Sequence, residues 1–396
     1  MNKNTNNHPQ FDPDNLEGAF GHLSNKDIKT RDRIFSLFNS KFLVKFGTSA
    51  VYKASRLGLP VSFFVPKKLY RLFVGGENLK QCAPLVIRLQ KDKVFTILDY
   101  AVEAKSGERE YDKTLNENLD ALAFGKKYPG LKVISAKISG LAENALLESI
   151  QKGEDLTENQ KDKLKKVRQR LDKLALSASE NNTGIFFDAE ESWVQNPMDM
   201  LVDELMEKYN KEKVVVFNTY QLYRKDRLDF LKKSFQNAKE KNFLLGAKIV
   251  RGAYIEKENE RAIKMGYPSP IHQSKSDTDN DYDAAIDFCL QNLKDISVCV
   301  ATHNENSCKL ALDLAQKYNI DLNHPHLFFS QLFGMGDHLT YNLANAGCNA
   351  TKYIPYGPIK EAIPYLMRRI QENSSVEGQM GRELGLLKKE IKRRNI

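Results

Sequence analysis

The stretch VFTILDYAV, residues 94–102, is the first of a series of short apolar runs that decides the fold. β-Branched and aromatic residues dominate these runs, as is typical of buried strands. No hairpin turn joins one run to the next, and the chain between two runs is long enough for a helix. The seven later runs are LKVISAKIS (131–139), TGIFFDAE (183–190), KVVVFNTY (213–220), LLGAKIVRGA (244–253), SVCVATHN (297–304), HLFFSQLFG (326–334) and NATKYIPY (349–356).

Eight runs of this kind, each followed by a helical segment, predict an α/β fold in the form of a parallel (β/α)8 barrel. The alternative is an open, doubly wound sheet. The clearest intervening helix is predicted for residues 154–180, where Thr157 and Gln160 form a capping box. Residues 266–283 are polar and rich in turn formers, so they predict a loop over one mouth of the barrel.

The chain divides into three predicted regions. Residues 1–90 form a helical region, with two or three helices between residues 24 and 74. Residues 91–380 hold the barrel, and residues 381–396 form a basic C-terminal tail. The 396 residues therefore suffice for one barrel preceded by helices.

The chain is basic, with 60 Lys and Arg against 51 Asp and Glu and a formal net charge of +9. Such an excess points to an anionic partner, and the charge alone leaves open whether this is nucleic acid, a lipid surface or a charged ligand. Hydrophobic residues make up 41% of the chain, enough for a large core. No apolar run approaches the roughly 18 residues that a membrane span requires.

The cysteines are scattered without a C-x-x-C pair, which argues against a disulfide framework and against a zinc site. They favour a reducing compartment. The polar start MNKNTNNHPQ has none of the features of a targeting peptide, so we expect a cytoplasmic protein. The five cysteines are Cys82, Cys289, Cys299, Cys308 and Cys348.

Polar residues stand at the carboxyl ends of the predicted strands, where (β/α)8 barrels build their active sites. A charge at the end of a buried strand must be paired or used in function. Of the seven histidines only His303 lies at a strand end, and carboxylates are few there, so no metal site is predicted. The strand-end residues are Lys137, Asp188, Asn218, Gln221, Lys248, Arg251, Thr302, His303, Asn304, Gln331 and Tyr353.

An arginine pair follows the last strand, in PYGPIKEAIPYLMRRIQENSS (355–375). Arg368 and Arg369 are adjacent, and Glu372 lies one helical turn after Arg368. Two guanidinium groups could bind one carboxylate. The alternative interpretation is a solvated helix face.

Six motifs, in order along residues 95–375, resemble the proline dehydrogenase family. The forms FNTYQ and KIVRGAY resemble its mitochondrial type most. The resemblance implies a distorted (β/α)8 barrel that binds FAD noncovalently. It also implies oxidation of L-proline to Δ1-pyrroline-5-carboxylate by hydride transfer to flavin N5, and electron transfer to a quinone. The motifs are DAEES (188–192), FNTYQLY (217–223), GAKIVRGAYIEKENERA (246–262), ATHNENS (301–307), QLFGMGD (331–337) and KYIPYGPIKEAIPYLMRRIQENS (352–374).

The resemblance also implies a role for each site residue. Asp188 and Lys248 would be the catalytic residues, with Asp188 orienting the cations and Lys248 lying at the reactive edge of the flavin. The substrate carboxylate would be bound by cations and the pyrrolidine ring enclosed by apolar walls, using Lys137, Leu332, Tyr353, Arg368, Arg369 and Glu372. The cofactor would be bound by Asn218, Lys248, Arg251, Gly252, Ala253, Thr302, His303 and Gln331.

No G-x-G-x-x-G motif follows a strand, so FAD is expected on the barrel itself. Since the chain ends at Ile396, a separate pyrroline-5-carboxylate dehydrogenase is the expected functional partner. The basic residues after Lys388 predict a peripheral contact with the inner face of a membrane, in the mitochondrion if the source is a eukaryote. No nucleic acid partner is expected for such an enzyme.

Two alternatives stay open. One is a hydroxyproline dehydrogenase of the same family, because Tyr353 could either tolerate or exclude a ring hydroxyl. The other is a noncatalytic basic barrel that binds nucleic acid or acidic lipid.

Overall fold

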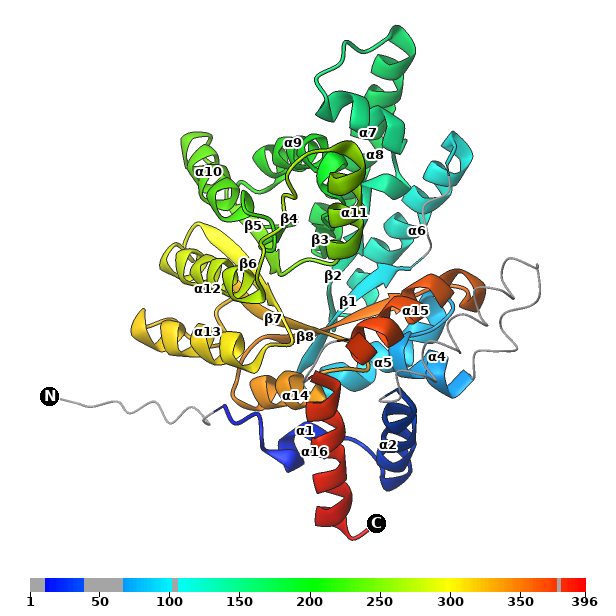
Figure 1. The fold of residues 1–396 in the computed structure, drawn as a ribbon, viewed down its shortest axis with the longest axis vertical. Coiled ribbons are helices and arrows are strands. Elements are labelled where there is room, and N and C mark those ends of the chain that lie inside the picture. Colours follow the sequence, from blue (N-terminus) through cyan, green and yellow to red (C-terminus); the bar gives the residue numbers. More distant parts are fainter. Residues whose placement is uncertain (1–10, 39–66, 102–105, 376–378) are drawn as a thin grey trace, which may run out of the picture. The chain divides into compact units, whose positions relative to one another are not determined.

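The computed structural model describes residues 11–38, 67–101, 106–375 and 379–396. Eight parallel strands close into a barrel in the order β1 to β8 (Figure 1). Each of the eight predicted runs overlaps one strand, so the predicted barrel is confirmed and the open sheet is wrong. The strands are β1 (Val94–Tyr100), β2 (Leu131–Ala136), β3 (Gly184–Phe187), β4 (Val216–Gln221), β5 (Leu245–Val250), β6 (Ile296–Ala301), β7 (Leu327–Leu332) and β8 (Ala350–Tyr356).

Helices follow the strands and also flank the barrel sequence at both ends. The predicted helix over 154–180 is present as α8, and the Thr157–Gln160 capping box is formed. The helices of the barrel are α6 (Glu108–Lys127), α7 (Asn144–Gln151), α8 (Glu158–Asn181), α9 (Ser192–Tyr209), α10 (Arg227–Glu240), α11 (Ile255–Met265), α12 (Lys275–Gln291), α13 (Glu305–Lys317), α14 (Asp337–Asn345) and α15 (Ile359–Ser375), with a 3-10 turn η2 (Ile138–Gly140). The flanking helices are α1 (Leu16–Phe20), α2 (Asn25–Phe38), α4 (Lys67–Phe73), α5 (Leu79–Lys91) and α16 (Gln379–Arg394).

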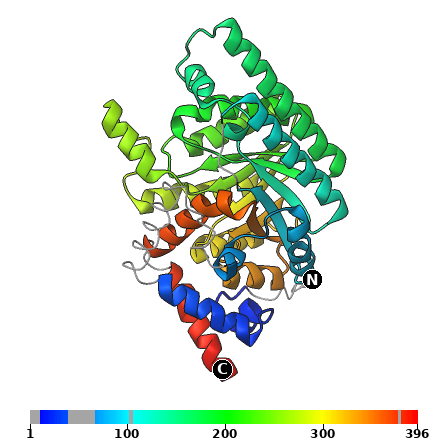
Figure 2. The same cartoon turned by 90° about the vertical axis from the view of Figure 1, so that its right-hand side faces the viewer.

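The residue contacts divide the chain into two compact units. Unit 1 comprises residues 1–103 and 330–396, and unit 2 comprises residues 104–329. The described N-terminal helices therefore belong to the same unit as β1, β8 and the C-terminal helices. Figure 2 shows α2, in dark blue, beside the red α16, and the two helices are in contact.

The predicted basic tail is mostly a helix, α16, packed into unit 1. Apolar residues on one face, among them Leu384 and Leu387, belong to the unit 1 core together with Phe20 and Phe35. Arg394 donates to the backbone oxygen of Phe20 at 2.8 Å. Part of the basic charge thus serves to dock this helix, a role that composition could not reveal.

The predicted loop over residues 266–283 is only half right. Its second half begins α12, where the Ser274 hydroxyl accepts from the Asp277 backbone in a capping box. Ile271, in the first half, forms an isolated bridge with Arg224. The polar residues that suggested a loop cover the exposed side of a helix whose buried side begins at Thr278.

Aromatic side chains stack within the strands of unit 2. The Phe186 ring lies 5.0 Å from that of Phe217, edge to face, and 6.0 Å from that of Phe328, stacked. Lys248 places its ammonium 5.3 Å from the centre of the Phe186 ring. The aromatic layer therefore supports the polar residues that follow at the strand ends.

Among the described helices, none has both the length and the apolarity that a membrane span needs.

Candidate functional site

A buried ion pair in unit 2 joins Lys248, in the second half of β5, to Asp188, the first residue after β3. Lys248 Nζ lies 2.5 Å from Asp188 Oδ1, with the two side chains 8% and 14% exposed. Burial alone would raise the pKa of Asp188, but Lys248, and more weakly Lys137, hold it below its ordinary value. The predicted site residues Lys137, Asp188 and Lys248 are thus close to one another. Because its pKa is lowered, Asp188 is an ionised carboxylate at neutral pH.

Arg251 is held in one orientation by three acceptors in unit 2. Its Nε donates to Asp279 Oδ1 at 2.7 Å, Nη1 to Thr302 Oγ1 at 2.8 Å and Nη2 to Ser307 Oγ at 2.9 Å. The guanidinium also lies over the Tyr282 ring, 4.3 Å from its centre. Predicted residues Arg251 and Thr302 therefore form a second fixed group, and His303 follows Thr302 in the chain.

Gly252 needs to be glycine for two reasons. Its φ is +136°, and a Cβ there would come within 2.3 Å of the Tyr223 ring. The absence of a side chain at Gly252 thus leaves room for the Tyr223 ring, and its contact with a cofactor stays a prediction. Ala253, the next predicted residue, is exposed.

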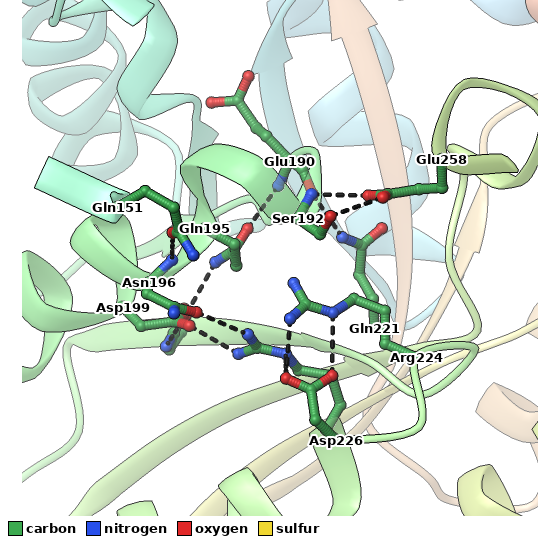
Figure 3. Close-up of polar contacts among 12 residues, drawn as sticks. Gln151, Glu190, Ser192, Gln195, Asn196, Asp199, Gln221, Arg224, Asp226 and Glu258 are labelled. Carbon is green, nitrogen blue, oxygen red and sulfur yellow. Dashed lines mark hydrogen bonds and ion pairs between the residues drawn. The ribbon is translucent and has the colours of Figure 1, made fainter. Parts of the chain in front are cut away.

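Glu190 links the segment after Lys137 to the turn after Asp188. Its Oε1 accepts from the Ser139 backbone at 3.0 Å and its Oε2 from the Ser139 hydroxyl at 2.6 Å. Burial raises the pKa of Glu190, while Lys137 acts in the opposite direction. Figure 3 shows the hydrogen bond from the backbone nitrogen of Glu190 to the side-chain oxygen of Gln195. The backbone oxygen of Glu190 accepts a hydrogen bond from the Gln221 side chain at 2.8 Å.

Glu258 anchors α11 to the start of α9. It is fully buried and accepts from both the backbone and the hydroxyl of Ser192, each at 2.6 Å (Figure 3). Tyr254 precedes α11, and burial raises the pKa of its phenol to about 12, with Lys137 lowering it and Glu190 raising it. The Tyr254 phenol thus belongs with the strand-end group.

Asn218 lies apart from the strand-end group. Its Nδ2 donates to Asp199 Oδ1 at 3.0 Å, and its Oδ1 accepts from the backbone of Thr219 at 2.8 Å. The residue paired with Lys248 in register is Thr219, so Thr219 shares the face of the sheet that Lys248 occupies. The hydrogen bond from Asn218 to a flavin stays a prediction, and its amide already has two partners.

Asp199 is the centre of a buried network between α9, β4 and α10. Its Oδ1 also accepts from Gln195 at 2.8 Å, and its Oδ2 pairs with Arg227 Nη1 at 2.6 Å. Both members of the ion pair are almost fully buried, at 2% and 3% exposure. Through Gln195, which binds the backbone of Glu190, the network supports the turn that positions Asp188.

Asp203, one turn later on α9, has a buried Oδ1 without a hydrogen-bond partner among the described residues. Burial, and then Asp199, raise its pKa to about 7. An unfolded aspartate titrates near pH 4, whereas Asp203 in the folded protein keeps its proton up to about pH 7. Ionisation of Asp203 therefore lowers the free energy of unfolding of the wild type as pH rises from about 4 to 7.

We expect Asp203→Asn to be more stable than the wild type by about 2 to 4 kcal/mol at pH 8, and equally stable near pH 4. Urea unfolding at both pH values measures this, and a difference independent of pH would contradict it.

The predicted residues of unit 1 lie on β7, β8 and α15. Leu332 ends β7 half-buried, and Tyr353 in β8 is 9% exposed. The backbone nitrogen of Phe333 donates to the Tyr353 oxygen at 2.9 Å. Gln331 is buried, and its Oε1 accepts from Thr340 Oγ1 at 2.8 Å.

Arg368, Arg369 and Glu372 lie on α15, and their side chains are outside the described residues. Among the residues that the structure describes, no group of three or more His, Cys, Asp or Glu could hold a metal ion.

Sequence reasoning missed Glu190, Glu258 and Tyr254. Tyr254 could have been found, because it directly follows the predicted Gly252 and Ala253 in the same motif. Glu190 could also have been found, because it ends the predicted run TGIFFDAE (183–190). Glu258 carries no comparable signal, since it stands in a charged segment typical of a solvated surface.

Comparisons with known proteins agree with one another. The family model described as proline dehydrogenase matches residues 83–382. "Proline dehydrogenase 1, mitochondrial" from Dictyostelium discoideum is 33% identical over 385 residues, covering 86% of this chain and 67% of that protein. "Hydroxyproline dehydrogenase" from Xenopus laevis is 30% identical over 415 residues, covering 95% of this chain and 89% of that protein.

Among solved structures, the chain is similar to proline utilization A (PutA) from Bdellovibrio bacteriovorus inactivated by N-propargylglycine. The TM-score is 0.72 at 21% identity, covering 83% of this chain and 36% of that one. At this identity the likeness supports the barrel fold alone.

Proposed function

Because the chain belongs to the proline dehydrogenase family, a family of oxidoreductases, we propose that it oxidises L-proline to Δ1-pyrroline-5-carboxylate with FAD as cofactor. The observation that supports this most is the buried Lys248–Asp188 pair at the strand ends of the barrel. Buried charges of this kind are concentrated at functional sites, and the neighbouring Lys137 adds a second cation.

The residues of unit 2 fit a flavin. The Thr219 hydroxyl is buried and has no hydrogen-bond partner among the described residues, although it shares a face with Lys248. An unsatisfied buried hydroxyl costs about 1 to 3 kcal/mol, so a polar ring edge at this position would relieve it. We therefore propose that Thr219, Lys248 and Arg251 hold the cofactor, which when bound supplies the hydride acceptor.

Lys248 supplies a fixed positive charge in a site of low exposure. Such a charge stabilises negative charge that develops close to it during the reaction, at no cost of reorganisation. Asp188 orients the ammonium, and because its pKa is lowered it stays ionised and does not donate a proton at neutral pH. Its proposed role is therefore orientation.

The proposed substrate contacts rest on the family resemblance. We propose that Lys137, Arg368 and Arg369 bind the proline carboxylate, and that Glu372 belongs to the same substrate site. The Ser139–Glu190 contacts fix the segment that follows Lys137.

A quinone is the proposed electron acceptor, and a separate pyrroline-5-carboxylate dehydrogenase is the proposed consumer of the product. A mitochondrial location is proposed if the source is a eukaryote, in line with the name of the Dictyostelium relative. Lys388, Lys389 and Lys392 of α16 are exposed and could meet acidic lipid as a peripheral contact. Sedimentation with acidic vesicles checks this contact, and protein left in the supernatant would refute it.

A second candidate is oxidation of hydroxyproline. The match to the Xenopus hydroxyproline dehydrogenase extends over 95% of this chain, which favours it as the alternative within the family. The two substrates differ by one ring hydroxyl, and the ratio of their kcat/KM values decides between them.

The proposed function is tested with the purified protein. It should be yellow and release FAD on denaturation, and L-proline should bleach the colour in the absence of oxygen. D-Proline, with the same groups in the opposite configuration, is the control and should bleach it far more slowly. A colourless protein, or a flavin that L-proline leaves oxidised, would refute the proposal.

A further inference from the structure

The turn between β7 and α14, residues 333–336, is held by several distant segments of unit 1. It connects Leu332 to Asp337, the first residue of α14. Gly334 has a φ of +82°, and a Cβ there would lie 2.2 Å from the backbone oxygen of Leu72 at the end of α4. The turn is therefore packed tightly against α4.

Lys352 binds this turn from the neighbouring strand β8. Its side chain is 1% exposed, and Nζ lies 2.5 Å from the Met335 oxygen, 3.5 Å from the Leu332 oxygen and 2.7 Å from Asp337 Oδ1. Tyr353 is the next residue of β8. One buried ammonium thus connects the strand that presents Tyr353 to the turn that follows Leu332.

Helices from both ends of the chain complete the arrangement. Arg31 of α2 pairs with Asp337 Oδ2, and Glu383 of α16 accepts from the Gly336 backbone at 3.0 Å. Burial alone would raise the pKa of Asp337, but Lys352 and Arg31 hold it well below its ordinary value. Asp337 is therefore ionised at neutral pH, and its contacts with Lys352 and Arg31 leave the turn little freedom.

Stability alone does not explain such a network. A buried ion pair adds little net stability compared with apolar residues of the same shape, whereas it fixes geometry closely. The geometry fixed here is that of Leu332 and Tyr353, the residues proposed to enclose the substrate ring.

We propose that Lys352 is a positioning residue that sets the separation of Leu332 and Tyr353, and through it the enzyme's choice between proline and ring-hydroxylated proline. This inference rests on the proposed function. A hydroxyl changes the ring by one small polar group, so a displacement of either wall by a few tenths of an ångström alters its fit.

The test compares Lys352→Met with Arg31→Met. Each variant removes one cation from Asp337, but only Lys352→Met releases the backbone oxygens of Leu332 and Met335. Both should lower the melting temperature and retain flavin. Only Lys352→Met should raise the KM for proline about tenfold with a smaller change in kcat, and change the proline to hydroxyproline ratio of kcat/KM about fivefold or more.

Glu383→Ala is the second variant, since it releases Gly336 without removing a charge from Asp337. It should change the substrate ratio in the same direction, and it keeps the test decisive if Lys352→Met does not fold. If the wild type oxidises proline and both variants keep the ratio of Arg31→Met, the inference is wrong and the proposed function stands. If the wild type oxidises neither imino acid, the proposed function falls first and the inference falls with it.

Discussion

Lys248→Met should lower the free energy of unfolding by about 3 to 5 kcal/mol at pH 7, because it leaves the Asp188 carboxylate without its nearest cation in a buried site. It should also reduce kcat to about one hundredth or less, because the fixed charge at the proposed flavin edge is lost. Urea unfolding and anaerobic reduction by L-proline measure the two effects separately.

The loss of stability in Lys248→Met should depend on pH. In the wild type the pKa of Asp188 is lowered, so its contribution to stability is present above the pKa of an unfolded aspartate and is lost as pH falls through the folded value. Without Lys248, burial raises that pKa, and Asp188 becomes neutral as pH falls. The difference between variant and wild type should therefore be largest near neutral pH and shrink toward pH 4.

The matched control is Lys248→Met combined with Asp188→Asn. Removing both charges leaves no unpaired carboxylate, so this double variant should regain most of the lost stability. It should not regain kcat. Recovery of kcat in the double variant would show that Lys248 only neutralises Asp188, and a single variant with normal kcat would overturn the assignment altogether.

The barrel could be predicted because strands buried on both faces appear as continuous apolar runs, and each of the eight runs overlaps a strand. The rule that active-site residues lie at the carboxyl ends of strands then located Lys137, Asp188 and Lys248, which come together within unit 2. Position along a strand thus selected three residues that meet, although it also selected Asn218, which lies apart from them.

A continuous apolar run does not show on which face of the sheet each of its side chains lies. In FNTYQ both faces of β4 are buried, so no alternation of polar and apolar residues distinguishes Asn218 from Thr219. The register with β5 decides it, since Thr219 and not Asn218 is the partner of Lys248. Register depends on contacts between strands and cannot be read from one of them.

The contacts of the supporting carboxylates Glu190 and Glu258 could not be predicted from the sequence for a different reason. Glu190 binds a residue 51 positions away, and Glu258 binds one 66 positions away. Surface glutamates are common in helices of this composition, and only the packing of α11 against the start of α9 makes Glu258 buried. Sequence therefore locates the cations of the site better than the groups that hold them.

Asp199 and Asp203 provide a sharp test of what the buried network on α9 does, because they lie one turn apart and should respond in opposite directions. Asp199→Ala should lower the free energy of unfolding by about 3 to 5 kcal/mol, since Arg227 loses its buried partner. Arg227 would keep a 3.5 Å contact with Asp226, whose side chain is 52% exposed, and a 3.4 Å hydrogen bond to the neutral Asn196. Asp203→Asn, by contrast, removes a carboxylate whose ionisation opposes folding.

Asp199→Ala should also impair turnover, although Asp199 touches neither substrate nor cofactor in the proposed mechanism. Its Oδ1 holds Gln195, and Gln195 holds the backbone of Glu190 in the turn that follows Asp188. We expect kcat/KM to fall about tenfold, with most of the loss restored in Asp199→Asn, which keeps an oxygen for Gln195. If both Asp199→Ala and Asp203→Asn changed the free energy of unfolding in the same direction and by the same amount, burial on α9 alone would explain their effects, and the hydrogen-bonded network would not. A normal kcat/KM in Asp199→Ala would show that the turn holds Asp188 without support from the helix.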